Sequence, residues 1–309
     1  MSNDPATCLP DAARSNVERG MALMAAGVLM TPGVHAIAKS LGDTLSVGQI
    51  SAARYFFQLF VLLPLVWFAH RGRIPPPRLS FAILGLLLAA ASVFFFLALT
   101  FMPLADSAAI FFVEPLLLAL ISFLFLGEPM GLRRLAAILV GFAGALIVIR
   151  PSFQSVGPAA LLPLLAGACF AIFLASTRRL SQDHDARAMQ LWTCIFAVAV
   201  LSAGMALSPF AGWELFRPTW PKGLEWALLG GMGVIALVSQ MLSIQALRVA
   251  PAGILAPFQY LEIFGATILG AFIFADLPDG VTMLGIAIIV GSGLYVFHRE
   301  RMLARRPVK

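Results

Sequence analysis

Charge is scarce in this sequence: only 12% of its 309 residues are charged, whereas 60% are hydrophobic. A soluble globule of this length needs far more polar side chains to cover its surface. The composition therefore predicts an integral membrane protein that is surrounded by the lipid bilayer. We expect no soluble domain, because only short turns such as FMP (101–103) separate many of the apolar runs.

Several motifs of other protein classes are missing. The three cysteines, Cys8, Cys169 and Cys194, lack the paired spacing of disulfides or metal sites. The chain has no P-loop GxxxxGK(S/T), which argues against an ATP-binding domain, and no DDxxD, HExxH or other catalytic set, which argues against a membrane enzyme. It also lacks a basic patch with interleaved aromatic residues. We expect no cofactor, no metal, no nucleic-acid partner and no enzyme activity.

Long apolar runs are abundant. Ten of them measure about 18 to 25 residues, which is enough for a helix to cross a hydrocarbon core of about 30 Å. The fold class expected is an all-α integral membrane protein with ten transmembrane helices. The predicted spans cover 20–38, 47–69, 79–100, 104–126, 132–149, 158–177, 188–207, 224–247, 251–275 and 281–298.

Lysine and arginine set the expected orientation, since they are retained on the cytoplasmic side of short loops. Of the 21 basic residues, 16 fall on the side that holds both chain ends, 4 fall on the other side, and Arg54 lies inside a span. We therefore expect cytoplasmic tails at 1–19 and 299–309 in a multi-pass protein of the cell inner (plasma) membrane. The polar first 19 residues argue against a secretory signal peptide.

The sequence repeats itself at an offset of 148 residues. ALTFMP (98–103) matches ALRVAP (246–251), and the same offset takes Glu114 to Glu262 and Glu128 to Asp276. The predicted halves, 20–150 and 151–298, each contain five spans. Because five is odd, the second half enters the membrane from the opposite side, which is the inverted-repeat architecture of many secondary transporters. This favours a carrier over a channel or a structural subunit.

Two carboxylates fall near the middle of predicted spans. Glu114, in FFVEPLLLALISFLFLGE (111–128), lies about 15 Å into its span at 1.5 Å per residue, and Glu262 lies about 16 Å into its own. A charge at this depth costs several kcal/mol unless it is paired, protonated or facing water, so such residues usually line a cavity or a proton path. The alternative is a protonated glutamate that ties helices together. Pro115 makes Glu114 the stronger candidate, because it frees the carbonyl of Phe111.

Arg54 is the single basic residue inside a predicted span and requires a partner. That partner is either Glu114, in a structural bridge, or an anionic or carbonyl group of the substrate. The corresponding stretch of the second half, MQLWTCIFAV, has Gln190 and Trp192 instead, so we expect an asymmetric cavity. Amides and aromatics at other intramembrane positions complete the candidate site: His35, Gln58, Trp192, Gln240, Gln245, Gln259 and Tyr260.

Taken together, the ten spans, Arg54 in the second span, the ALxxxP turns before spans four and nine, the EP at 114–115 and the GE at 127–128 resemble the EamA branch of the drug/metabolite transporter superfamily. The resemblance covers nearly the whole chain. It implies a secondary carrier with a central cavity between the halves and alternating access. The expected partners are a small-molecule substrate and the lipid bilayer, and the chain is expected to be a monomer or a homodimer.

The stretch PGVHAIAKSLGDTLSVGQISAARYFFQ (32–58) resembles the subgroup that takes up preformed metabolites such as riboflavin or S-adenosylmethionine, although His35 stands where an acidic residue is common. Aromatic faces, amides, one arginine and two glutamates suit a flat, largely uncharged molecule. We therefore expect uptake of riboflavin or a similar vitamin. Two alternatives stay open: S-adenosylmethionine uptake, which unpaired Glu114 and Glu262 would favour, and export of amino acids or related amphipathic metabolites or drugs.

Overall fold

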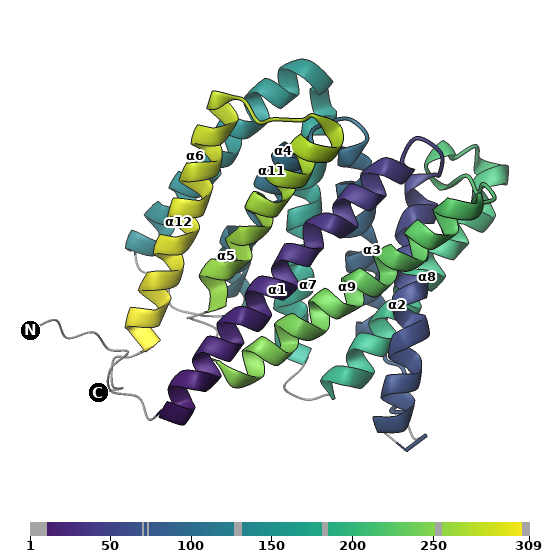
Figure 1. Cartoon of the computed structure of the whole chain (residues 1–309), viewed down its shortest axis with the longest axis horizontal. Coiled ribbons are helices and arrows are strands. Elements are labelled where there is room, and N and C mark those ends of the chain that lie inside the picture. Colours follow the sequence, from purple (N-terminus) through teal and green to yellow (C-terminus); the bar gives the residue numbers. More distant parts are fainter. Residues whose placement is uncertain are drawn as a thin grey trace, which may run out of the picture.

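The structure is a computed structural model that describes residues 11–69, 71–72, 74–126, 132–180, 185–250 and 255–304. Every regular element in these ranges is a helix (Figure 1). In chain order the helices are α1 (Asp11–Leu41), α2 (Val47–Ala69), α3 (Leu79–Leu99), α4 (Leu104–Phe111), α5 (Glu114–Leu126), α6 (Leu132–Val156), η2 (Gly157–Leu161), α7 (Leu162–Leu180), α8 (Ala186–Ala211), η3 (Glu214–Phe216), α9 (Gly223–Val249), η4 (Ala256–Tyr260), α11 (Leu261–Phe274) and α12 (Gly280–Ala304). The expected all-α class is confirmed.

Seven helical segments of the described chain are long and apolar enough to cross a membrane. Six of them have 18 to 27 residues, and the seventh, Leu135–Thr177, has 43. Two shorter apolar helices, Phe258–Phe274 and Gly280–Tyr295, follow. These lengths make the chain a multi-pass membrane protein. The count of ten crossings stays a prediction.

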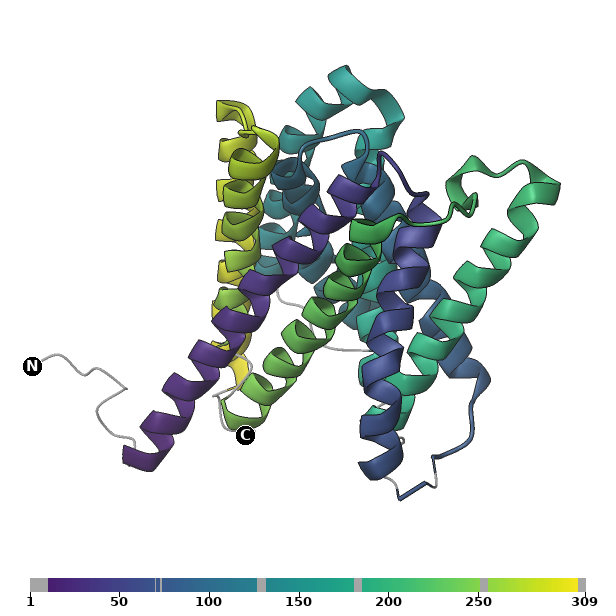
Figure 2. The same cartoon turned by 45° about the vertical axis from the view of Figure 1, so that its right-hand side comes forward.

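Helices from the two halves of the sequence pack against each other. α1 runs along α9, α6 along α12, and α3 lies between α7 and α8. Figures 1 and 2 show the pairs α1–α9 and α6–α12 side by side from both directions. The start of α1 and the end of α12 lie at one end of the bundle; we call the opposite end, where α1 and α11 finish, the distal end.

Large apolar side chains cover the outside of the bundle. Phe60, Phe68, Phe210 and Phe272 are each exposed over more than 70% of their surface. A soluble protein rarely exposes so many bulky apolar groups, whereas acyl chains cover such a face at no cost. The interior holds two main apolar clusters, one chiefly among α1, α2, α3, α8 and α9 and one chiefly among α4, α6, α11 and α12.

The predicted span 104–126 is not one continuous helix. α4 ends at Phe111 and α5 begins at Glu114, and at the junction the amide of Val113 donates to the carbonyl of Ile110 (3.2 Å), as in a tighter helical turn. Pro115 explains this break, because it has no N–H to donate to Phe111 and its ring clashes with that carbonyl. The α-helical part of predicted span 251–275 likewise begins late, at Leu261 after the 3₁₀ turn η4. Residues 251–254, like Glu128, lie outside the described chain.

Candidate substrate-binding site

Both midspan carboxylates sit at the start of a half-helix. Glu114 is the first residue of α5 and Glu262 is the second residue of α11. The dipole of a first helical turn favours a negative charge there. α4 packs against α11, and Glu262 lies close enough to Glu114 for their charges to interact. The two repeat-related carboxylates thus lie within range of each other, each in the first turn of an α-helix.

His35 of α1 faces Glu262. The His35 Nδ1 atom lies 3.7 Å from the Glu262 Oε1 atom, and it is buried with no hydrogen-bond partner. The imidazole packs on the ring of Phe95, with 4.5 Å between the ring centroids. Gly265, one turn after Glu262, allows this approach, because a Cβ there would lie 2.8 Å from Pro32 of α1. α1 and α11 therefore meet closely beside an unsatisfied titratable pair.

Arg54 of α2 points to α3. Its Nη1 donates to the Ser92 hydroxyl at 3.1 Å, and that hydroxyl also hydrogen-bonds the Tyr55 hydroxyl. The guanidinium lies 5.8 Å from the centroid of the Phe96 ring, within cation–π range. Its Nε is buried without a partner. A planar donor with a free edge is suited to bind an incoming carboxylate or carbonyl.

Arg54 and Glu114 form no ion pair in the described chain. Of the two carboxylates, Glu262 is the one whose charge interacts with Arg54. Neither glutamate is neutralised by a bonded arginine. We call His35, Arg54, Ser92, Glu114 and Glu262 the central cluster.

An amide pair lies one helical turn from Arg54. Gln58 is buried, and its side-chain nitrogen donates to the Gln240 side-chain oxygen of α9 at 2.6 Å. Each amide satisfies part of the other's hydrogen-bonding demand in an apolar setting. Gln58 and Gln240 thus link α2 to α9 beside the central cluster.

Aromatic rings continue from the central cluster toward α7. Phe95 contacts Phe111 at 5.2 Å, Phe111 contacts Phe170 at 5.7 Å, and Phe112 contacts Tyr260 at 5.6 Å between centroids. Gly167 of α7 faces the helix break: a Cβ there would lie 2.9 Å from the Phe111 carbonyl oxygen. The break is thus lined by rings and by a closely packed glycine.

Three predicted residues lie away from this group. The side chains of Gln245 and Gln259 are exposed. Gln245 follows Gln240 by five positions, so the two point to different faces of α9. Gln259 is exposed, whereas its neighbour Tyr260 is buried. The indole Nε1 of Trp192 donates to the Pro75 carbonyl at 2.8 Å, so it anchors the α2–α3 connection.

Sequence reasoning missed Ser92 and Phe170. Ser92 is a hydroxyl within the apolar stretch LLLAAASVFFF, and that isolation was an available signal. Phe170 is one of 25 phenylalanines and carried no signal of its own.

Comparison with protein families decides the class of the molecule. The model of the EamA-like transporter family matches residues 18–150 and matches again over residues 157–297. The chain belongs to the EamA-like transporter family. The family expected from the resemblance is thereby confirmed.

Curated relatives of this EamA-like chain are transporters. The S-adenosylmethionine uptake transporter of Rickettsia felis is 27% identical over 271 residues, which are 87% of this chain and 89% of that protein. The riboflavin transporter of Rhizobium johnstonii is 28% identical over 253 residues, 82% of this chain and 80% of that protein. The pseudopaline exporter of Pseudomonas aeruginosa is 30% identical over 207 residues, 67% and 70% of the two chains.

A solved crystal structure shares the fold. It aligns with a TM-score of 0.62 and 19% sequence identity over 93% of this chain and 99% of that one. At this identity the match speaks for the fold alone.

Proposed function

We propose that this protein is a secondary carrier that moves a small organic metabolite across the cell inner membrane by alternating access. The halves 20–150 and 151–298 would be inverted repeats of five spans each. A 43-residue apolar segment supports ten crossings, since at helical rise it measures about 65 Å, roughly twice the hydrocarbon thickness. Both termini would be cytoplasmic, and the distal end would face outward.

The helix break before Glu114 and the change from a 3₁₀ turn to an α-helix before Glu262 carry this proposal. Transporters built from inverted repeats bind substrates at interrupted helices near the bilayer midplane, where free helix ends meet charged groups. Here the two positions are related by the internal repeat, α4 packs against α11, and the two carboxylates lie near enough for their charges to interact. In this proposal Glu114 and Glu262 bind positive charge on the substrate or a coupled proton, and Arg54 binds a carboxylate or carbonyl.

The charges of the central cluster favour a substrate with more positive than negative groups. The cluster offers two glutamates and one arginine, and no arginine of the described residues is bonded to either glutamate. S-adenosylmethionine carries a sulfonium, an ammonium and a carboxylate in its methionine part and a flat adenine in its nucleoside part. These groups match two acids, one guanidinium and the rings of Phe95 and Phe111. We propose S-adenosylmethionine or a similar cationic metabolite as substrate, in place of the flat neutral vitamin expected from sequence, because the Arg54–Glu114 bridge is not formed.

Riboflavin is the second candidate. The rings that run from Phe95 to Phe170 suit a flat tricyclic molecule, and the amides of Gln58 and Gln240 suit its hydrogen-bonding edge. Riboflavin transporters are also among the relatives. One relative is named as an exporter. A carrier moves its substrate down whichever gradient it is coupled to, so the direction of transport must be measured.

Uptake by cells tests the substrate. Cells that lack their own importers and express the protein should accumulate radiolabelled S-adenosylmethionine, and excess unlabelled compound should compete. Accumulation of labelled riboflavin without S-adenosylmethionine uptake would assign the vitamin. Resistance to amino-acid analogues with neither uptake, at confirmed surface expression, would assign export.

A further inference from the structure

An ion pair joins the two halves of the chain at the distal end. Lys39 lies in the last turn of α1 and is paired with Asp276, which directly follows the αL cap of α11. The Lys39 Nζ atom also lies 4.7 Å from the centroid of the Phe274 ring and 3.5 Å from the Met102 carbonyl oxygen. Lys39 thus contacts the chain before α4 and the chain after α11 at once.

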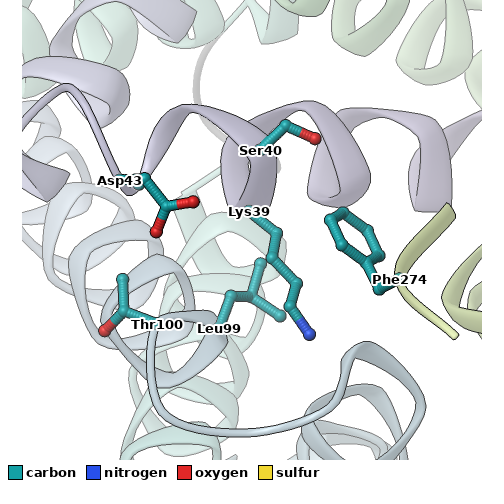
Figure 3. A pocket seen from close by; sticks show the side chains of 7 residues that line it. Lys39, Ser40, Asp43, Leu99, Thr100 and Phe274 are labelled. Carbon is teal, nitrogen blue, oxygen red and sulfur yellow. The ribbon is translucent and has the colours of Figure 1, made fainter. Parts of the chain in front are cut away.

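Lys39 lines a small pocket at the distal end. Its volume is about 130 Å³, and Figure 3 shows the side chains that line it. Ser40, Asp43 and Thr100 supply polar groups, and Leu99 and Phe274 supply the apolar wall. The side chains of Lys39 and Asp276 are only 17% and 27% exposed, so the pair is partly withdrawn from water. An ion pair in such a place is screened less than one on an open surface.

The backbone holds Asp276 in position. Ala275 ends α11 in the left-handed conformation, with φ of 55°, and the Asp276 amide donates to the Gly270 carbonyl at 3.0 Å. Glycine is the usual residue at such a helix cap, because a Cβ disfavours this conformation. This strained cap turns the chain directly before Asp276. We take it to direct the Asp276 carboxylate toward Lys39.

The same two helices carry two members of the central cluster, His35 and Glu262. His35 lies one turn before Lys39 on α1, and it faces Glu262 on α11. The contact between α1 and α11 therefore contains two polar links, His35–Glu262 in the middle and Lys39–Asp276 at the distal end.

We infer that Lys39 and Asp276 form the distal gate of the carrier, an inference that rests on the proposed transport function. The pair holds α1 against α11 while the distal end is closed, and it separates each time that end opens. Lys39 and Asp276 are positioning residues, since neither belongs to the central cluster. Their loss leaves the binding groups in place and shifts the conformational equilibrium toward the open distal end.

Cysteine accessibility in the absence of substrate tests this gate. In a background without Cys8, Cys169 and Cys194, a cysteine replaces Leu99, which is 1% exposed at the wall of the pocket. Its labelling by a membrane-impermeant maleimide from outside reports opening. Asp276→Asn and Lys39→Met should each raise the labelling rate about tenfold, since a tenfold shift corresponds to the loss of one partly buried ionic link.

The matched control is Glu214→Gln, which removes an exposed ion pair with Arg217 at the same end (3.8 Å) and should leave the rate unchanged. The charge exchange Lys39→Asp with Asp276→Lys should restore slow labelling, which separates a lost ion pair from misfolding. Slow labelling in both single variants, at normal elution in size-exclusion chromatography, would overturn the gate. So would fast labelling in the exchanged double variant. Because no substrate is present, neither result depends on the identity of the transported metabolite.

Discussion

The His35 imidazole lies 3.7 Å from the Glu262 carboxylate, so a helix of the first half and an interrupted helix of the second half meet at a titratable pair. Arg54 and Glu114 both lie near enough to Glu262 for their charges to interact with it. Glu262 thus interacts with His35, Arg54 and Glu114 of the central cluster. We expect a ligand that binds or protonates the Glu262 carboxylate to affect α1, α2 and the α4–α5 break at the same time.

Glu114→Gln should abolish transport at normal surface expression. Glu114 lies at the start of α5 with no cationic partner in the described chain, so the amide removes a charge that only a substrate or a proton would satisfy. Loss of a charge-assisted hydrogen bond alone predicts a fall of at least about 10- to 100-fold in kcat/KM, and loss of a coupling carboxylate removes the remaining transport. Initial uptake rates across pH measure it, with Glu214→Gln as the control. Unchanged kinetics and pH dependence would remove Glu114 from the mechanism.

Arg54→Gln should discriminate between the candidate substrates. Its free Nε edge is expected to bind a substrate carboxylate, so S-adenosylmethionine uptake should show KM raised about tenfold or more. Riboflavin, which has no carboxylate, should be affected less. Arg217→Gln, in an exposed loop, is the control. An equal loss for both compounds would indicate that Arg54 is structural, through its bond to Ser92.

Gly167→Ala should destabilise the α4–α5 break. The added Cβ would lie 2.9 Å from the Phe111 carbonyl oxygen and 3.7 Å from the Glu114 Cβ, which forces α7 away. Overpacking of this kind costs about 1–3 kcal/mol. Thermal unfolding in detergent measures the change. Gly231→Ala is the matched control, since no atom lies within 4 Å of its Cβ position. Equal melting temperatures for the two variants would contradict the packing described.

Topology can be tested by thiol labelling. Cysteines at 43 and 215 should react with impermeant reagents from outside, and cysteines at 75 and 182 should not. The loop after α1 and η3 lie at the distal end, and the α2–α3 connection lies at the opposite end (Figures 1 and 2); residue 182 lies outside the described chain. The reverse pattern would invert the orientation inferred from the lysine and arginine count.

Much of this architecture could be predicted from sequence, because the features that indicate it depend on the order of residues along the chain. Apolar run length predicts membrane helices, and the offset of 148 residues relates Glu114 to Glu262 before any contact is known. Pro115 even indicates the break that separates α4 from α5. These features depend on neighbours in the chain and on symmetry between halves.

The partners of the site residues could not be predicted in the same way. Arg54 donates a hydrogen bond to Ser92 because α2 and α3 pack together at these two residues. The order of residues along the chain does not specify this contact. Residue type alone groups Gln245 with Gln240. Gln245 is exposed, because the helical repeat places it on a different face of α9. Lys39 and Asp276 are 237 residues apart in sequence, and only the packing of α1 on α11 makes them a pair.

Counterflow in proteoliposomes tests the central claim most directly, that this chain is an alternating-access carrier with Glu114 and Glu262 at its binding site. Vesicles preloaded with unlabelled S-adenosylmethionine are diluted into a trace of labelled compound. A carrier should concentrate the label inside transiently, and Glu114→Gln and Glu262→Gln should each abolish this overshoot while the purified variants elute as the wild type does. Label that only equilibrates without overshoot, or an overshoot preserved in both variants, would contradict the account.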